Sequence, residues 1–130
     1  MLKKSPTVSV LLVDDEPLIR WSLAETLSER GYRVLEAGDG RGALEALKAS
    51  LAPIDVIMLD YRLPDSNGLQ LLGQIRALSP ASRVVLMTAY GTPEVLAEAL
   101  RLGAVCVVNK PIEMHDVPGL VTRARGLALS

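Results

Sequence analysis

Residues 8–16 read VSVLLVDDE. The run from Val8 to Val13 is apolar apart from Ser9, and three carboxylates follow it without a spacer. A nearly continuous apolar run of this length is typical of a strand that is buried on both faces of a parallel sheet. The abrupt change to acidic side chains predicts that the strand ends here and presents these carboxylates at its carboxyl end.

Short β-rich runs recur along the chain, and stretches with helical spacing lie between them. The predicted strands are Val8–Val13, Arg33–Ala37, Asp55–Leu59, Arg83–Met87 and Val105–Val108. The helical stripes contain Ile19, Leu23 and Leu27; Leu44, Leu47 and Leu51; Leu71, Ile75 and Leu78; Leu96, Ala99 and Leu100; and Val117, Leu120, Val121 and Ala124. Five alternations of strand and helix predict an α/β fold, a single-domain (βα)5 doubly wound parallel five-stranded sheet. In the fifth helix, Pro118 and Gly119 disfavour a clean start.

Composition narrows the class of protein. A chain of 130 residues that is 49% hydrophobic can bury one core, so we predict one domain over residues 8–125 and flexible termini at residues 1–7 and 126–130. The chain has fourteen basic and fifteen acidic residues, so it lacks the excess of positive charge expected of a domain that binds nucleic acid directly. One Cys and one His supply neither an internal disulfide nor a zinc site. The first apolar run is too short for a signal peptide or a membrane span, so we expect a cytoplasmic protein without membrane contact.

Polar side chains stand at the carboxyl ends of four predicted strands: Asp14 and Asp15, Asp60, Thr88, and Lys110. Taken singly, the acids could cap helices or turns, and the lysine could be an ordinary surface residue. In sheets of this kind, however, ligands bind beyond these strand ends. At an effective dielectric constant of ~20, two carboxylates about 4 Å apart repel by roughly 4 kcal/mol. A divalent cation would offset that repulsion, and an all-oxygen ligand set favours Mg²⁺.

Four motifs together resemble the receiver domain of two-component response regulators. They are VLLVDD at residues 10–15, IMLD at residues 57–60 with Pro64 and Gly68 after it, Met87-Thr88-Ala89, and Lys110-Pro111. Their order and separation agree with the family over nearly the whole chain. The resemblance implies a flavodoxin-like sheet with the strand order 2-1-3-4-5.

The resemblance also implies the roles of the acidic residues. Asp60 would accept a phosphoryl group from a phosphohistidine of a sensor histidine kinase. Asp15, Asp60 and the backbone carbonyl of Arg62 would hold Mg²⁺ directly, while Asp14 would act through water. The domain would catalyse only its own phosphorylation and dephosphorylation, and would not be an enzyme acting on other substrates.

Transmission of the signal follows from the same resemblance. Thr88 and Lys110 would contact the phosphoryl group, and the Thr88 hydroxyl would draw its loop after it. The responding face in this family, helix four, strand five and helix five, maps onto Pro93–Leu102, Val105–Val108 and Asp116–Arg125. That face would control an output domain or partner protein, or pair two copies of the chain. The last residues resemble no output domain, so we expect a stand-alone regulator or part of a longer one, such as a transcription activator.

Two positions depart from the family pattern. Val107 and Ile112 stand where the family usually has aromatic side chains, and the first of these is its moving part. A β-branched side chain has few rotamers, so coupling through a rotating ring is in doubt. Arg62 and Tyr90 occupy positions that flank the path of attacking water in this family. Their size predicts slow loss of the phosphoryl group.

Three alternatives compete with this interpretation. A degenerate receiver would keep the fold but act as a phosphorylation-independent interaction module, which the altered Val107 position favours. Residues 38–43, GDGRGA, match the dinucleotide-binding spacing G-x-G-x-x-A, but they follow the second strand and the second mononucleotide half is missing. A metal-dependent phosphatase with an aspartyl nucleophile would need an acid two residues after Asp60, where Arg62 stands.

Overall fold

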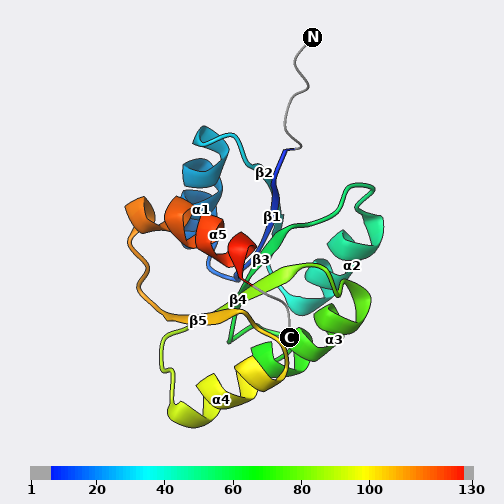
Figure 1. Ribbon diagram of the computed structural model, residues 1–130, viewed down its shortest axis with the longest axis vertical. Helices are drawn as coiled ribbons and strands as arrows, with labels where there is room; N and C mark the ends of the chain where they lie inside the picture. The colour runs from blue at the N-terminus through cyan, green and yellow to red at the C-terminus, as the bar shows by residue number, and fades with distance from the viewer. Residues whose placement is uncertain (1–6, 128–130) are drawn as a thin grey trace.

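The computed structural model of this chain describes residues 7–127 and contains one parallel sheet with helices on both sides (Figure 1). Its strands are β1 (Ser9–Val13), β2 (Arg33–Ala37), β3 (Val56–Asp60), β4 (Arg83–Thr88) and β5 (Cys106–Asn109). Its helices are α1 (Pro17–Glu29), α2 (Gly40–Ala49), α3 (Gly68–Leu78), α4 (Pro93–Arg101) and α5 (Val117–Gly126), with the 3-10 helix η1 (Met114–Asp116) before α5. The strand order is β2-β1-β3-β4-β5. The predicted fold class and strand order are therefore confirmed.

The termini predicted to be flexible fall almost entirely outside this description. Residues 1–6 and 128–130 lie outside the described residues. Gly126, which the sequence places in the terminus, is the last residue of α5. Among the described residues, no helix combines the length and the apolar character needed to cross a membrane.

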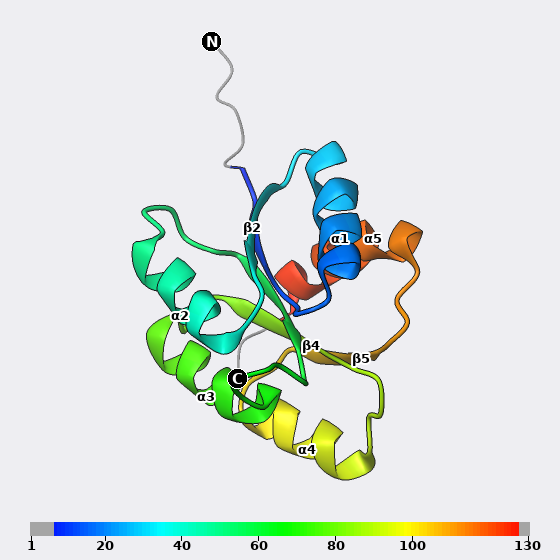
Figure 2. The same ribbon diagram turned by 180° about the vertical axis from the view of Figure 1, so that it is seen from behind.

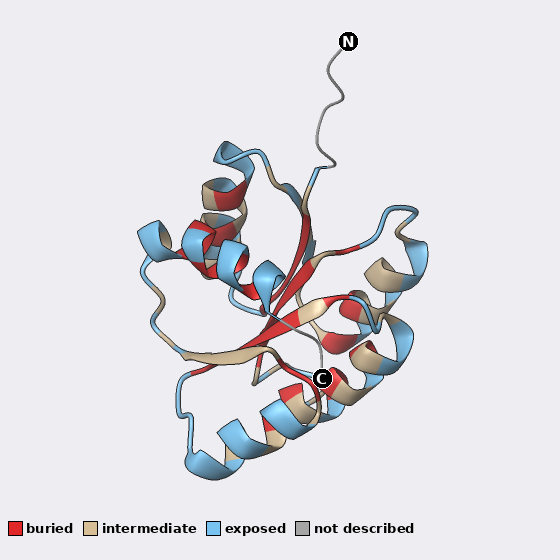
Figure 3. Ribbon diagram, in the orientation of Figure 1, coloured by how far each residue is buried: buried red, intermediate tan, exposed pale blue. Residues whose placement is uncertain are grey.

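The sheet is buried between two layers of helices. Helices α1 and α5 cover one face, and α2, α3 and α4 cover the other (Figures 1 and 2). Side chains of β1 alternate between these layers, because successive residues of a strand point to opposite faces. Leu11 and Val13 pack on the side of α2 to α4, whereas Val10 and Leu12 pack on the side of α1 and α5. Burial is concentrated in the central strands (Figure 3), so an aliphatic core supports the fold without a single Phe.

Two helix boundaries differ from the sequence-based expectation. Helix α2 ends at Ala49, because Ser50 takes an extended conformation, and Leu51, predicted to continue its apolar stripe, is fully exposed. Helix α5 begins at Val117 in spite of the following Pro118. A proline in the first helical turn costs no hydrogen bond, since its missing N–H has no partner within the helix there. The expectation that this proline prevents a clean start is wrong.

The carboxylate of Asp65 joins the loop after β3 to the first turn of α2. Its Oδ1 accepts a hydrogen bond from the backbone N–H of Gly40 at 2.8 Å, and its Oδ2 accepts one from the N–H of Arg41 at 3.0 Å. These two hydrogen bonds lower the pKa of the Asp65 carboxyl below its ordinary value of 3.8. The loop that leaves Asp60 is thereby tied to a neighbouring helix.

This contact makes a pH-dependent contribution to stability. A carboxyl with a lowered pKa in the folded state stabilises the fold above its unfolded pKa, and the contribution is lost as the pH falls through the folded pKa. We therefore expect Asp65→Asn to lower the urea midpoint at neutral pH, and the difference from the unaltered chain to shrink below pH 3.8. Urea unfolding at two pH values measures this. A difference that is equal at both would contradict the assignment.

Candidate functional site

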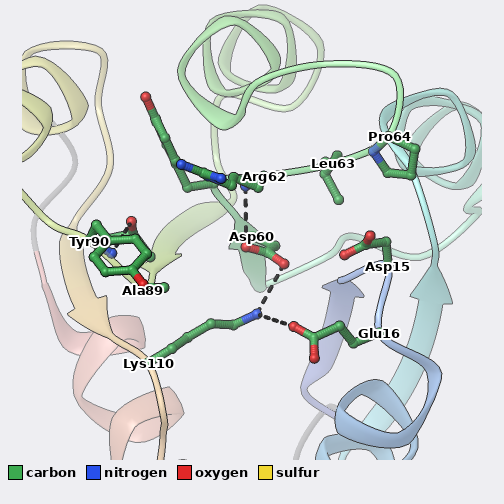
Figure 4. A pocket seen from close by; sticks show the side chains of 11 residues that line it. Asp15, Glu16, Asp60, Arg62, Leu63, Pro64, Ala89, Tyr90 and Lys110 are labelled. Carbon is green, nitrogen blue, oxygen red and sulfur yellow. Dashed lines mark hydrogen bonds and ion pairs between the residues drawn. The ribbon is translucent and has the colours of Figure 1, made fainter.

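Polar groups from four separate parts of the sequence meet at the carboxyl edge of the sheet. Asp14 follows β1, Asp60 and Thr88 are the last residues of β3 and β4, and Lys110 follows β5. A pocket of about 310 Å³ opens at this edge (Figure 4), lined by Asp15, Glu16, Asp60, Tyr61, Arg62, Leu63, Pro64, Thr88, Ala89, Tyr90 and Lys110. Five of the predicted site residues, Asp15, Asp60, Arg62, Thr88 and Lys110, line this pocket, and the sixth, Asp14, contacts Lys110.

Lys110 is the centre of the charge arrangement. Its Nζ lies 3.0 Å from Oδ2 of Asp60 and 3.1 Å from Oδ2 of Asp14, and both carboxylates are buried. A third carboxylate oxygen, Oε1 of Glu16, lies 3.4 Å from the same ammonium (Figure 4). One cation thus faces three carboxylates, two from the loop between β1 and α1 and one from the end of β3.

The loop between β1 and α1 is held by its own polar groups. Oδ1 of Asp14 accepts a hydrogen bond from the Glu16 N–H at 2.9 Å, and the Asp14 N–H donates to the carbonyl of Ala37 at 3.1 Å. Glu16 is the N-cap residue of α1, so the alternative that Asp14 or Asp15 caps this helix is wrong. Asp15 is left exposed, with its carboxylate directed towards Asp60 (Figure 4).

The loop after Asp60 is positioned just as closely. Oδ1 of Asp60 accepts a hydrogen bond from the Arg62 N–H at 3.3 Å, and the Gly68 N–H donates to the carbonyl of Tyr61 at 2.6 Å. A Cβ atom at Gly68 would lie 2.7 Å from the Cα of Tyr61. Only glycine allows α3 to begin this close to the backbone that follows Asp60, which accounts for the glycine in this motif.

Burial and charge oppose each other in this site. Burial raises the pKa of the Asp60 carboxyl, and the nearby negative charge of Asp14 adds to the rise, against the lowering effect of Lys110. Burial alone would lower the pKa of Lys110, but its hydrogen bonds to Asp60 and Asp14 outweigh burial and raise that pKa. Lys110 is therefore a permanent cation at neutral pH, next to the Asp60 carboxylate, whose charged form is disfavoured by burial.

The acidic groups also form a set that could hold a metal ion. One carboxylate oxygen from each of Asp14, Asp15, Glu16 and Asp60 can be chosen so that all lie within 4.8 Å of one another. An all-oxygen set of this charge suits a hard divalent cation such as Mg²⁺. Glu16 was not among the ligands expected from the sequence, although it belongs to the acidic run that ends β1. The residues present therefore fit the ion that the sequence analysis implies.

Comparison with known proteins decides the family. The family model described as "Response regulator receiver domain" matches residues 10–122. The chain belongs to this family. The match covers every strand of the sheet but for the first residue of β1, and it contains all the residues of the candidate site.

Relatives of this receiver domain differ in length. The regulatory protein AtoC of Escherichia coli (strain K12) is 37% identical over 115 residues, which are 88% of this chain but 24% of AtoC. The sporulation initiation phosphotransferase F of Bacillus subtilis (strain 168) is 30% identical over 88% of this chain and 90% of its own length. This receiver domain therefore spans about a quarter of AtoC and nearly all of the phosphotransferase.

A solved structure of another response regulator shares the fold. It is that of a response regulator protein from Burkholderia pseudomallei "with a phosphorylated aspartic acid, calcium ion and citrate". It superposes with a TM-score of 0.81 at 27% identity, over 92% of this chain and 69% of that one.

The two unusual positions of this receiver domain are occupied by packed side chains. Val107 is half-buried and packs against the core cluster on the side of α4, while Ile112 packs against the cluster on the side of α1 and α5. The Thr88 hydroxyl oxygen accepts a hydrogen bond from the Tyr90 N–H at 3.2 Å. The loop after β4 is therefore held by Thr88 itself, and Val107 adds no ring that could rotate.

Proposed function

We propose that this receiver domain accepts a phosphoryl group on Asp60 from a phosphohistidine of a sensor histidine kinase, in a reaction that depends on Mg²⁺. The observation that carries the proposal is the position of the Lys110 ammonium, 3.0 Å from Asp60 and 3.1 Å from Asp14, at an open pocket lined by further acids. A pocket so arranged neutralises charge at the point where a phosphoryl group would arrive.

The side chains divide the chemistry among them. A carboxylate oxygen of Asp60 forms the new bond to phosphorus while the bond between phosphorus and the donor nitrogen breaks, and no adjacent base is needed because the carboxylate is already ionised at neutral pH. Lys110 stabilises the negative charge of the phosphoryl oxygens. Thr88 lies at the end of β4, next to β3, where its O–H can donate a hydrogen bond to the product while its oxygen still accepts from the Tyr90 N–H.

We assign the metal ligands as the family resemblance implies. Asp15, Asp60 and the backbone carbonyl of Arg62 would hold Mg²⁺ directly, and Asp14 would act through water. Asp14 suits the outer role because it is fully buried and, unlike Asp15 and Asp60, does not line the pocket. When bound, Mg²⁺ supplies positive charge against the phosphoryl oxygens in transfer.

The partners of the domain are part of the same proposal. The names "regulatory protein" and "phosphotransferase" of the two relatives support a regulator that takes part in phosphoryl transfer within a phosphorelay. We place this regulator in the cytoplasm. The face of α4, β5 and α5 would pass the signal to an output domain or partner protein, or pair two copies of the chain. The domain would catalyse only its own phosphorylation and dephosphorylation. The complete acidic site counts against the alternative of a phosphorylation-independent module.

Labelling by a small phosphodonor tests the proposal directly. The purified chain is incubated with acetyl phosphate in Mg²⁺ buffer or in excess chelator, and its intact mass is then measured. We expect the addition of one phosphoryl group in Mg²⁺ and none in chelator, because the acidic set repels an anionic donor until a cation neutralises it. Equal labelling in both buffers would refute the metal dependence.

Tyr90 offers a prediction about the lifetime of the phosphorylated state. Its side chain is 77% exposed and lines the pocket, on the side away from Asp15 and Glu16 (Figure 4). A ring in this place limits the approach of water to the phosphoryl group. We expect Tyr90→Ala to raise the rate of autodephosphorylation severalfold without altering the fold, measured as the decay of phosphorylated protein after removal of the donor. An unchanged or lower rate of autodephosphorylation would contradict this prediction.

A further inference from the structure

The side chain of Arg20 folds back from α1 onto the loop that carries Asp14 and Asp15. Its Nη1 donates a hydrogen bond to the backbone carbonyl of Asp14 at 2.5 Å, and its Nε donates to Oε1 of Glu36 on β2 at 3.2 Å. With 22% of its side chain exposed, Arg20 is more enclosed than any other arginine in an ion pair among residues 7–127. It touches neither the pocket nor the Lys110 ammonium.

The bond from Arg20 completes the fixation of one peptide group. The carbonyl of Asp14 belongs to the same peptide unit as the N–H of Asp15, so its direction determines where the Asp15 backbone starts. The Asp14 N–H is bonded on the preceding side, to the carbonyl of Ala37. Residues of β2 thus hold both backbone groups of Asp14. Ala37 bonds to the N–H directly, and Glu36 holds the carbonyl through its pair with Arg20.

The absence of a side chain at Gly38 leaves space for the Arg20 guanidinium. A Cβ atom at Gly38 would lie 3.2 Å from Nη1 of Arg20, closer than a side chain and a guanidinium ordinarily approach. Gly38 does not have a positive φ, so its backbone does not require glycine. The missing side chain at this position leaves room for Arg20.

We propose that Arg20 is a positioning residue for the metal site: it fixes the peptide between Asp14 and Asp15, and so directs the Asp15 carboxylate towards Asp60 without touching the ion. This inference rests on the proposed function, since it assumes that the acidic set binds Mg²⁺. Groups beyond the ligands that orient them commonly change metal affinity by 10-fold or more.

The sign of the effect separates positioning from simple electrostatics. Removing the guanidinium takes away a positive charge and leaves Glu36 unpaired near the acidic cluster. Coulomb's law alone would then make Mg²⁺ bind more tightly. Loss of positioning makes Mg²⁺ bind more weakly, because the peptide before Asp15 is no longer held in one orientation and its carboxylate is no longer directed towards Asp60. A purely structural role would lower stability and leave the affinity of the folded protein unchanged.

Calorimetric titration of Mg²⁺ into the full chain tests the proposal, at a temperature where circular dichroism shows each variant folded. We expect Arg20→Gln to weaken Mg²⁺ binding about tenfold, and Arg20→Lys to restore part of the loss, since lysine can donate to the Asp14 carbonyl. Arg41→Gln is the matched control. It breaks an Arg–Glu pair with the same 3.2 Å Nε–Oε1 distance on the surface of α2, and should bind Mg²⁺ like the unaltered chain.

Gly38→Ala provides a second test that changes no charge. Its Cβ displaces the Arg20 guanidinium, so we expect weaker Mg²⁺ binding in the same direction as Arg20→Gln but smaller. Unchanged or tighter binding by Arg20→Gln and Gly38→Ala would overturn the proposal. If the unaltered chain bound no Mg²⁺, the metal dependence of the proposed function would fail, and the role of Arg20 with it. The two failures are therefore distinguishable in one set of titrations.

Discussion

Replacing Asp60 by Asn is expected to reduce labelling by acetyl phosphate in Mg²⁺ to background. The carboxamide has nearly the same shape as the carboxylate, but it has no ionised oxygen with which to attack phosphorus. It also removes one negative charge from the set that would hold the cation. Intact-mass measurement with and without the donor gives the result directly.

The same substitution is not expected to weaken the fold. Burial and the charge of Asp14 together outweigh the favourable pairing with Lys110 and raise the pKa of the Asp60 carboxyl, so a neutral group is tolerated here. Lys110 also keeps its pairing with Asp14. Asp55→Asn is a matched control, because Asp55 precedes the same strand at the opposite edge of the sheet, where its carboxylate accepts the Ser9 N–H. It should be labelled like the unaltered chain. Labelling of Asp60→Asn at the unaltered rate would remove Asp60 as the acceptor.

Replacing Lys110 by Met is expected to produce the largest loss of stability among these substitutions. The Lys110 side chain is 13% exposed, and its ammonium pairs with Asp14 and Asp60, whose side chains are 0% and 7% exposed. Removing one partner of such a pair leaves buried charge uncompensated, and a cost of about 3 kcal/mol in the free energy of unfolding is expected. Urea unfolding in chelator measures it.

Mg²⁺ should restore part of that stability, because it brings positive charge back to the same carboxylates. The gain in unfolding free energy on adding Mg²⁺ should therefore be larger for Lys110→Met than for the unaltered chain. Labelling by acetyl phosphate should still fall, since the phosphoryl oxygens lose their protein cation. Lys48→Met, the same change on the exposed surface of α2, serves as the control. Equal stability of Lys110→Met and this control in chelator would show that Lys110 does not balance the buried acids.

The site was predictable from the sequence to the extent that it depends on strand ends. Asp14, Asp60, Thr88 and Lys110 each follow or end an apolar run, and parallel strands bring such ends to one edge. Glu16 was missed as a member of the site. Its backbone caps α1, and the direction of its side chain towards Lys110 depends on where that helix begins.

Intrinsic helix propensity and apolar spacing predicted the helices less well where tertiary packing opposes them. Pro118 and Gly119 are both weak helix formers, yet α5 contains them, because Val117, Leu120 and Val121 are buried against the sheet. Leu51 fits the spacing of an apolar stripe, yet it lies beyond the end of α2 and is exposed. The spacing of apolar residues shows which side chains a helix could bury on one face. The neighbouring helices and strands determine which of those side chains are in fact buried.

The alternation of strand and helix, the aliphatic core and the polar residues at the strand ends could all be predicted from the chain without its structure. These features depend on residues that are close together in the sequence, because side-chain periodicity and the change from apolar to polar residues are local patterns. The contacts among these residues depend on the folded structure. The Lys110 ammonium reaches Asp60 and Asp14 across 50 and 96 positions of sequence, and Arg20 reaches Glu36 across 16. Such distances of 3 Å between remote groups follow from the packing of the whole sheet and its helices, which no short segment specifies.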